Sequence, residues 1–176
     1  MQKDNEINKN TLMNIAKKMS IAARTAPKAR GIDNIEIAIA EDFDINLIAE
    51  KMDEISNEKN LPFFSRDAQN LRNASTLLLI GTKINPINLP FCGLCGMGNC
   101  ENKNKHPEIP CTFNTTDLGI ATSSAASVAM DNRVDNRIMY TVGMAVKELG
   151  LMENDVKIIY GIPLSAKGKN IFFDRK

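Results

Sequence analysis

Four cysteines lie within twenty residues of one another, and the 176-residue chain contains no others. They are Cys92, Cys95, Cys100 and Cys111. Clustered cysteines hold zinc or an iron–sulfur cluster, and four ligands complete either kind of site. The first two follow a Cys-x-x-Cys spacing, which allows two sulfurs in one turn to reach the same centre. This spacing predicts a metal centre that all four cysteines share.

Two other features of this segment bear on the ligand set. Gly93 and Gly96 follow the first two cysteines and leave the backbone free to point amide N–H groups toward sulfur. His106 is a fifth candidate ligand, but four cysteines already fill such a site. The sequence therefore favours His106 as a solvated loop residue beside Lys105 and Glu108.

Three interpretations of the cysteines stay open: an iron–sulfur cluster, structural zinc, and a disulfide or inert thiols. With 43% apolar residues, the chain has enough material for a sizeable core. A chain of this size does not need disulfides to fold, which weakens the third interpretation.

Composition limits the partners of the protein. The formal net charge is +1, so no global field attracts nucleic acid. No apolar run approaches the ~20 residues of a membrane span, and residues 1–6 contain no apolar signal core. We therefore expect a cytoplasmic protein with no membrane and no nucleic-acid partner. The chain contains a single histidine and therefore few side chains suited to acid–base catalysis. The composition does not decide whether the protein is an enzyme.

Apolar periodicity predicts the elements that position the cysteines. Helices are expected at 10–26, 45–57, 66–73, 116–131 and 136–149, and strands at 35–40, 76–81 and 156–161. Asp44 and Ser65 are candidate caps of the second and third helices. The continuous apolar run at 76–81 is typical of a strand covered on both faces. This order predicts one α/β or α+β layered domain over residues 1–176.

The cysteines lie in the longest irregular segment, about 85–114, which is rich in proline and glycine. Connections longer than ~15 residues in a compact domain are usually functional. A metal centre would also explain how such a segment stays ordered.

The run Cys-Gly-x-Cys-Gly-x-x-x-Cys resembles the motif of a small four-cysteine ferredoxin-type domain. That domain occurs in corrinoid iron–sulfur proteins and in membrane electron-transport subunits, where it holds a 4Fe-4S cluster. The resemblance implies that Cys92, Cys95, Cys100 and Cys111 are cluster ligands. This chain departs from the motif near the third cysteine, where Gly98-Asn99 replaces the usual proline, and its fourth cysteine arrives early.

Nearly the whole chain resembles an uncharacterised prokaryotic family of ferredoxin-domain-containing proteins. Besides the cysteine run, four segments carry the resemblance: 23–31, 63–68, 131–140 and 161–175. This family implies a class of protein rather than a particular reaction.

A second resemblance is to the flavin-dependent nitroreductases. It rests on Ala-Ala-Arg-Thr-Ala-Pro (22–27), on Asp-Leu-Gly-Ile-Ala (117–121) and on a late strand that ends in Gly-Ile-Pro (161–163). The resemblance implies an α/β/α sandwich that forms a homodimer with FMN at the interface. The cysteine-rich loop would then be inserted after a central strand.

The flavin anchors of that family are only partly matched. Its N-terminal Arg-Ser-x-Arg helix, which grips the FMN phosphate, is missing here, and Lys28 replaces the motif serine. Lys28, Arg30, Lys167 and Lys169 are candidates for the phosphate, because clustered cations favour a dianion. Exposed basic residues at loop ends are an equally good interpretation.

The doublet at 131–137, Asp-Asn-Arg-Val-Asp-Asn-Arg, has two interpretations. On a helix, i,i+4 spacing would put Asp131 with Asp135 on one face, as in an anion or cofactor site. The favoured interpretation is a helix junction, with Asp135 or Asn136 starting the next helix.

These observations support three functional hypotheses. The first is a cytoplasmic iron–sulfur protein with a redox or electron-transfer role, since electron transfer needs no acid, base or nucleophile. Its electron donor and acceptor are unknown. The second is a scaffold or binding module with structural zinc. The third is an FMN oxidoreductase with a structural metal.

Overall fold

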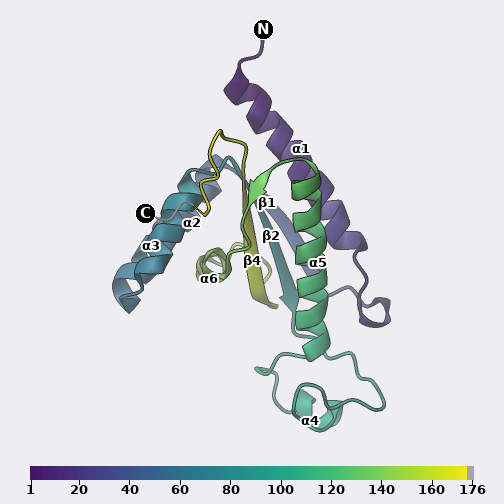
Figure 1. Ribbon diagram of the computed structural model, residues 1–176. Coiled ribbons are helices and arrows are strands. Elements are labelled where there is room, and N and C mark those ends of the chain that lie inside the picture. Colours follow the sequence, from purple (N-terminus) through teal and green to yellow (C-terminus); the bar gives the residue numbers. More distant parts are fainter. Residues whose placement is uncertain (174–176) are drawn as a thin grey trace.

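Four strands form the antiparallel sheet at the centre of the molecule, in the order β1-β2-β4-β3. The computed structural model describes residues 1–173 of the chain (Figure 1). The strands are β1 (Ile35–Ala40), β2 (Thr76–Lys83), β3 (Asp135–Asn136) and β4 (Val156–Ser165). The predicted strands at 35–40, 76–81 and 156–161 are thus confirmed, and two of them are longer than predicted.

Helices cover both faces of the sheet (Figure 1). Helices α1 (Asp4–Thr25) and α5 (Thr112–Asp131) pack on one face. Helices α2 (Asp42–Lys59), α3 (Pro62–Arg72) and α6 (Tyr140–Leu149) lie on the other. The short helix α4 (Cys100–Asn104) lies beyond one end of the sheet. The predicted α/β/α sandwich is therefore confirmed.

Strand β2 separates two apolar cores. Side chains alternate across a strand, so Leu77 and Leu79 pack against α2, α3 and α6, while Leu78 and Ile80 pack against α1 and α5. Its first seven residues are buried, as the continuous apolar run predicts. This central strand leads directly into the cysteine-containing segment.

Strand β4 runs through Gly161 and Pro163, where the sequence pattern suggests an end. Gly161 exchanges two backbone hydrogen bonds with Met139, at 2.8 and 3.0 Å. The backbone N–H and C=O groups of the odd-numbered residues of β4 therefore point away from β2. The backbone nitrogen of Pro163 therefore points toward β3, which pairs with β4 over only two residues. The missing N–H of this proline removes no hydrogen bond to the central strand β2.

Two predicted helix caps are wrong. Helix α2 begins at Asp42, so Asp44 lies in its first turn, where its charge complements the helix dipole. Helix α3 begins at Pro62, because proline fits the first helical position without losing a bond. The hydroxyl of Ser65 instead donates to Asp53 Oδ1 at 2.7 Å.

The predicted helix over 136–149 is also wrong at its start. Helix α5 ends at Asp131, and Arg133 adopts a left-handed conformation with φ of 60°. Asp135 and Asn136 then form β3 beside Ser165 and Leu164, so Asp135 does not share a helix face with Asp131. The chain turns here because Val134 is buried under α5.

No helix in the described residues is both long and apolar enough to cross a membrane.

Candidate metal centre in the cysteine loop

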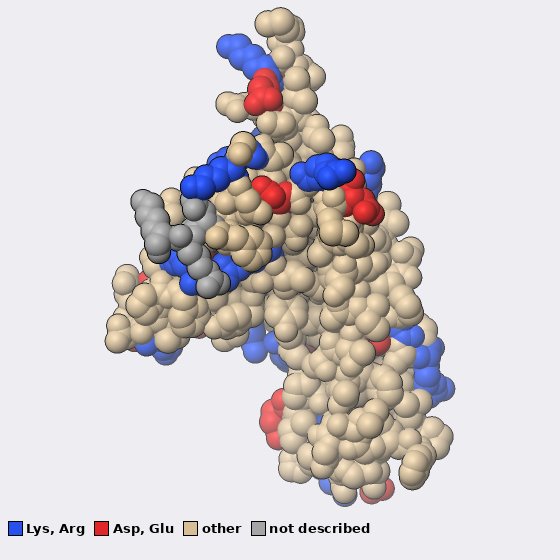
Figure 2. Space-filling view, in the orientation of Figure 1, with Lys and Arg blue, Asp and Glu red and all other residues tan. Residues whose placement is uncertain are grey.

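The cysteines occupy residues 84–111, between the end of β2 and the start of α5, which we call the cysteine loop. The loop projects beyond one end of the sheet (Figure 1). Figure 2 shows it as a lobe below the main body, with few charged side chains on the visible face. The predicted placement of the cysteines after a central strand is confirmed.

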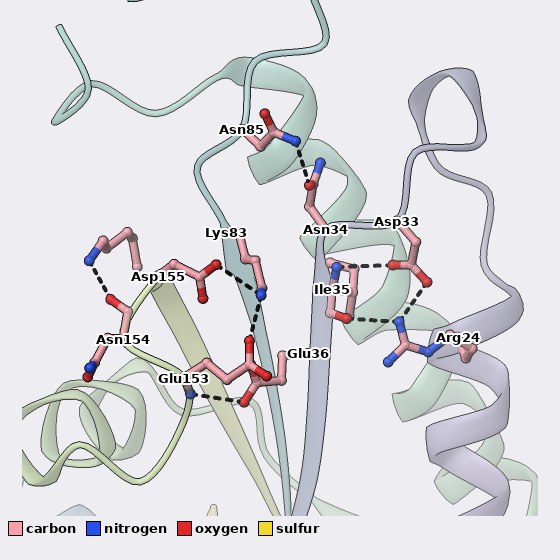
Figure 3. A network of polar contacts seen from close by, with 11 residues as sticks. Arg24, Asp33, Asn34, Ile35, Glu36, Lys83, Asn85, Glu153, Asn154 and Asp155 are labelled. Atoms are coloured by element: carbon pink, nitrogen blue, oxygen red, sulfur yellow. Dashed lines mark hydrogen bonds and ion pairs between the residues drawn. The ribbon is translucent and has the colours of Figure 1, made fainter.

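Buried amide side chains anchor the base of the cysteine loop. The backbone N–H of Asn85 donates to Asn114 Oδ1 at 2.9 Å, and Asn85 Nδ2 donates to Asn34 Oδ1 at 3.2 Å. Figure 3 shows the second of these bonds beside the ends of β1 and β2. Ile87 is buried, and its carbonyl accepts a 3.4 Å hydrogen bond from Arg30.

Glycines shape the turn between the first two cysteines. The N–H of Gly96 donates to Gly93 O at 2.9 Å, which closes the turn that contains Cys95. A Cβ atom at Gly93 would lie 2.8 Å from Gly98 O, so only glycine fits there without a backbone shift. Gly96 and Gly98 have φ of 82° and 76°, a region that side chains disfavour. The glycines of the motif thus meet a local steric requirement.

The other two cysteines lie at helix starts. Cys100 is the first residue of α4, and Asn99 caps that helix by accepting a 2.8 Å bond from Asn102 N–H. Cys111 is the N-cap residue of α5, and its carbonyl accepts from Thr115 N–H. The positive end of the α5 dipole therefore lies next to Cys111, where it would stabilise a negatively charged group.

All four cysteines are free thiols, Cys111 buried and the others half-buried. Within residues 1–173, no three Cys, His, Asp or Glu side chains gather closely enough to hold a metal ion. The four thiols suit a four-thiolate centre by their chemistry. Their sulfur atoms do not converge on one point in this structure. Binding through all four sulfurs requires the cysteine loop to tighten.

Several polar groups in the cysteine loop or at its base are candidates for contact with a cluster. Among the described residues, the buried amide nitrogens Asn34 Nδ2 and Asn114 Nδ2 have no hydrogen-bond partner. Lys103 is only 2% exposed, and its Nζ donates to His106 O at 3.1 Å. A buried cation and spare N–H donors suit an anionic sulfur-rich centre. Sequence reasoning missed all three residues, since nothing in their spacing marks them as buried.

The remaining residues of the cysteine loop differ in exposure. The side chain of His106 is 49% exposed, and its Nδ1 lies 3.4 Å from Glu108 Oε1. The Phe91 side chain is fully exposed beside Cys92. It borders a shallow hollow of about 390 Å³ together with the apolar residues Leu89, Leu94 and Phe113.

The structure separates the four candidate phosphate ligands into two pairs. Lys28 and Arg30 lie at the end of the sheet that carries the cysteine loop, because Arg30 contacts Ile87 there. Lys167 and Lys169 follow the end of β4, at the opposite end of the sheet. One chain therefore cannot bring all four cations to one phosphate.

Lys28 and its neighbour in space, Asp117, have structural contacts. The Lys28 Nζ donates to the carbonyls of Ala23 and Arg24, at 2.7 and 2.5 Å, and so caps the end of α1. Burial lowers the pKa of Lys28 from its ordinary value. Both carboxylate oxygens of Asp117 accept from Ala29 N–H at 3.1 Å, and burial raises the pKa of Asp117. These contacts fix the Ala29–Gly31 turn against α5.

Several solved structures similar to this one are described as flavoproteins or as containing FMN. An oxidoreductase described as containing FMN superimposes with a TM-score of 0.59 at 18% identity, covering 89% of this chain and 67% of the other. A nitroreductase with bound FMN from Desulfitobacterium hafniense gives 0.59 at 13% identity, covering 96% and 80%. A BluB-like flavoprotein from Clostridium difficile gives 0.54 at 17% identity, covering 93% and 84%. At these identities the likeness shows a nitroreductase-like fold.

Sequence relatives show the family. An uncharacterized protein of Archaeoglobus fulgidus is 40% identical over 164 residues, which are 89% of this chain and 88% of the relative. A family model described as "Uncharacterized protein containing a ferredoxin domain (DUF2148)" matches residues 108–175, a segment that includes Cys111. The fold, the four cysteines and these matches agree with the resemblances in the sequence. The chain belongs to this family of ferredoxin-domain proteins, on a nitroreductase-like fold.

Proposed function

We propose that this is a cytoplasmic iron–sulfur protein in which Cys92, Cys95, Cys100 and Cys111 hold a 4Fe-4S cluster for electron transfer. The observation that carries the proposal is that all four cysteines, each a free thiol, belong to one projecting loop. Reducing conditions in the cytoplasm keep such thiols available for a metal. A bound cluster would supply one-electron redox chemistry.

The residues around the cysteines have distinct roles under this proposal. The Gly93–Gly96 turn carries Cys95 and directly follows Cys92. Cys100 and Cys111 are held at the starts of α4 and α5. Lys103 offsets negative charge at the centre, and the spare amide of Asn114 donates to sulfur. The fully exposed ring of Phe91, next to Cys92, is a surface that a redox partner would contact.

Metal and sulfide analysis after anaerobic purification tests the proposal. We expect about four irons and four sulfides per chain, with a brown colour that dithionite bleaches. A colourless protein with one zinc per chain would refute the redox role and support a structural zinc scaffold instead.

Cys95→Ala is expected to abolish cluster binding, because three thiolates leave one iron without its protein ligand. The same variant should make residues 85–114 more sensitive to protease, since the metal orders that segment. The matched control is Leu94→Ala, which removes a mostly exposed neighbour with no ligand atom and should keep full metal content. Equal iron content in the two variants would contradict the ligand assignment.

A second candidate function is an FMN oxidoreductase, which the likeness to FMN-containing structures favours. Arg30 is the best candidate for the phosphate, because Lys28 is engaged by two backbone carbonyls. We expect Arg30→Ala to weaken FMN binding about tenfold, the equivalent of one charged hydrogen bond. Lys167→Ala, at the opposite end of the sheet, is the control and should leave affinity unchanged. Titration by flavin fluorescence measures both, and no quenching at micromolar FMN excludes this candidate.

A further inference from the structure

A cavity of about 470 Å³ lies where the cysteine loop meets the main body of the molecule. In Figure 2 a notch separates the lobe from the main body on one side. The cavity has an apolar lining of Ile84, Pro107, Pro110 and Ile158. Ile84 is the first residue of the cysteine loop and Pro110 precedes Cys111, so both ends of the loop border this space. Cavities of this size hold small organic ligands.

Charged side chains complete the lining. Lys147 lies in the last turn of α6 and Lys157 near the start of β4, whereas Glu108 belongs to the cysteine loop. The Glu108 carboxylate lies 3.4 Å from His106 Nδ1, and no ion pair among the described residues joins it to either lysine. The cavity is therefore bordered by two ammonium groups and one carboxylate, which leave it with a net positive charge.

The ammonium group of Lys147 is not used by its own helix. Gly150 N–H donates to Lys147 O at 3.3 Å from a left-handed conformation, so the backbone itself closes the end of α6. Glu148, the adjacent acid, lies near Lys51 of α2. Within the part of the chain that the structure describes, the Lys147 ammonium has no hydrogen bond or ion pair. Its charge is thus available to a ligand.

The acids next to Lys157 are engaged by another lysine. Glu153 and Asp155 both pair with Lys83, at 2.5 and 2.9 Å, and Figure 3 shows the two carboxylates turned toward it. The Lys157 ammonium donates to Asn154 O at 2.5 Å, a bond that holds the side chain and leaves it further N–H donors. Lys157 therefore keeps both its charge and spare donors at the cavity.

We propose that this cavity binds a small organic carboxylate with an apolar body. The carboxylate would accept hydrogen bonds from Lys147 and Lys157, because charge-assisted hydrogen bonds are stronger than neutral ones. The apolar body would cover the isoleucine and proline side chains, which are otherwise open to water. Glu108 lowers the net charge of the lining, which suits a singly charged carboxylate better than a phosphate dianion. None of the four candidate ligands for the FMN phosphate lines this cavity.

A role for this ligand follows from its place at both ends of the cysteine loop, and that role rests on the proposed function. A carboxylate in contact with Ile84 and Pro110 would hold the two ends of the loop against the main body. Metal binding through all four cysteines requires the same loop to tighten. The metal and the carboxylate would then change each other's affinity by the same factor.

Calorimetric titration of the purified protein with naphthoate tests the site. We expect Lys147→Met and Lys157→Met each to weaken naphthoate binding about tenfold, since each removes one charged hydrogen bond. Lys18→Met, an exposed lysine of α1, is the matched control and should leave the affinity unchanged. Naphthalenemethanol, which has the same rings without the charge, should bind about tenfold more weakly than naphthoate. Inorganic phosphate, which has no apolar body, should also bind more weakly.

No heat of naphthoate binding at millimolar concentration would overturn the inference, as would equal affinities in the wild type and both cavity variants. Equal binding of the neutral alcohol would exclude recognition of the carboxylate, and tighter binding of phosphate would exclude a contribution from the apolar lining. Metal and sulfide content, measured on the same samples, should be the same in all variants. Naphthoate binding to a protein without iron would leave the site intact and refute the cluster proposal alone.

Discussion

Gly143→Ala is expected to destabilise the protein by about 3 kcal/mol or more, because α6 packs on β4 with no room for a methyl group. A Cβ atom at Gly143 would lie 1.8 Å from Ile159 O and 2.5 Å from its carbonyl carbon. Both are backbone atoms of β4, so the clash is relieved only by moving the helix away from the sheet. The higher helix propensity of alanine, worth about 1 kcal/mol, offsets only part of this cost.

The control for this prediction is Gly119→Ala, the same substitution in the exposed middle of α5. No atom lies within 4 Å of a Cβ there, so the variant should gain about 0.5–1 kcal/mol. Urea unfolding monitored by circular dichroism measures both variants. A shift of the same sign for the two substitutions would show that α6 does not contact β4 this closely.

Asp67→Ala is expected to cost about 3 kcal/mol, because it leaves the buried Thr141 hydroxyl without an acceptor and removes a buried carboxylate that pairs with two arginines. The Asp67 carboxylate accepts from Thr141 Oγ1 at 3.0 Å and from the Arg66 guanidinium at 2.9 and 3.1 Å. Arg137 lies 3.5 Å from the same carboxylate and donates to Phe172 O at 3.3 Å. Asp67 thus links α3 to the start of α6 and to the C-terminal segment.

Asp53→Ala is the matched control for Asp67. Its carboxylate also accepts from a hydroxyl and an arginine, Ser65 at 2.7 Å and Arg72 at 2.6 Å, but the side chain is 31% exposed. Surface pairs of this kind contribute about 1 kcal/mol or less, since water replaces the lost partner. Thermal unfolding separates the two, and limited proteolysis should show residues 170–173 released only in the Asp67 variant. An equal loss of stability in the two variants would mean that the Asp67 contacts contribute no more than an exposed ion pair.

The Asp67 contacts explain three segments that carry the family resemblance. Residues 63–68, 131–140 and 161–175 are far apart in sequence, and Asp67, Arg137 and Phe172 bring one residue of each together. Residues 174 and 175 lie outside the described part of the chain. The interpretation of the 131–137 doublet as a junction is partly right, because the doublet lies between α5 and α6 and Arg137 pairs with Asp67. Its predicted helix start was wrong.

Local sequence patterns predicted the helices and strands whose apolar residues are regularly spaced. Strand β2 is a run of leucine and isoleucine, and it is buried on both faces as that run predicts. Residues 4–9 of α1 and the whole of α4 carry no apolar stripe, so periodicity did not show them. Strand β3 has two residues and exists only because β4 lies beside it.

The sequence by itself determined that four cysteines share one loop after a buried strand, because residue spacing and hydrophobic period are local properties. Only the tertiary structure decided the all-antiparallel sheet, the separation of Lys28 from Lys167, the burial of Lys103 and the cavity between the cysteine loop and the main body. These depend on strand register and on contacts between residues far apart in the chain. Such contacts form only when the whole fold buries its two cores, and no short-range pattern encodes them.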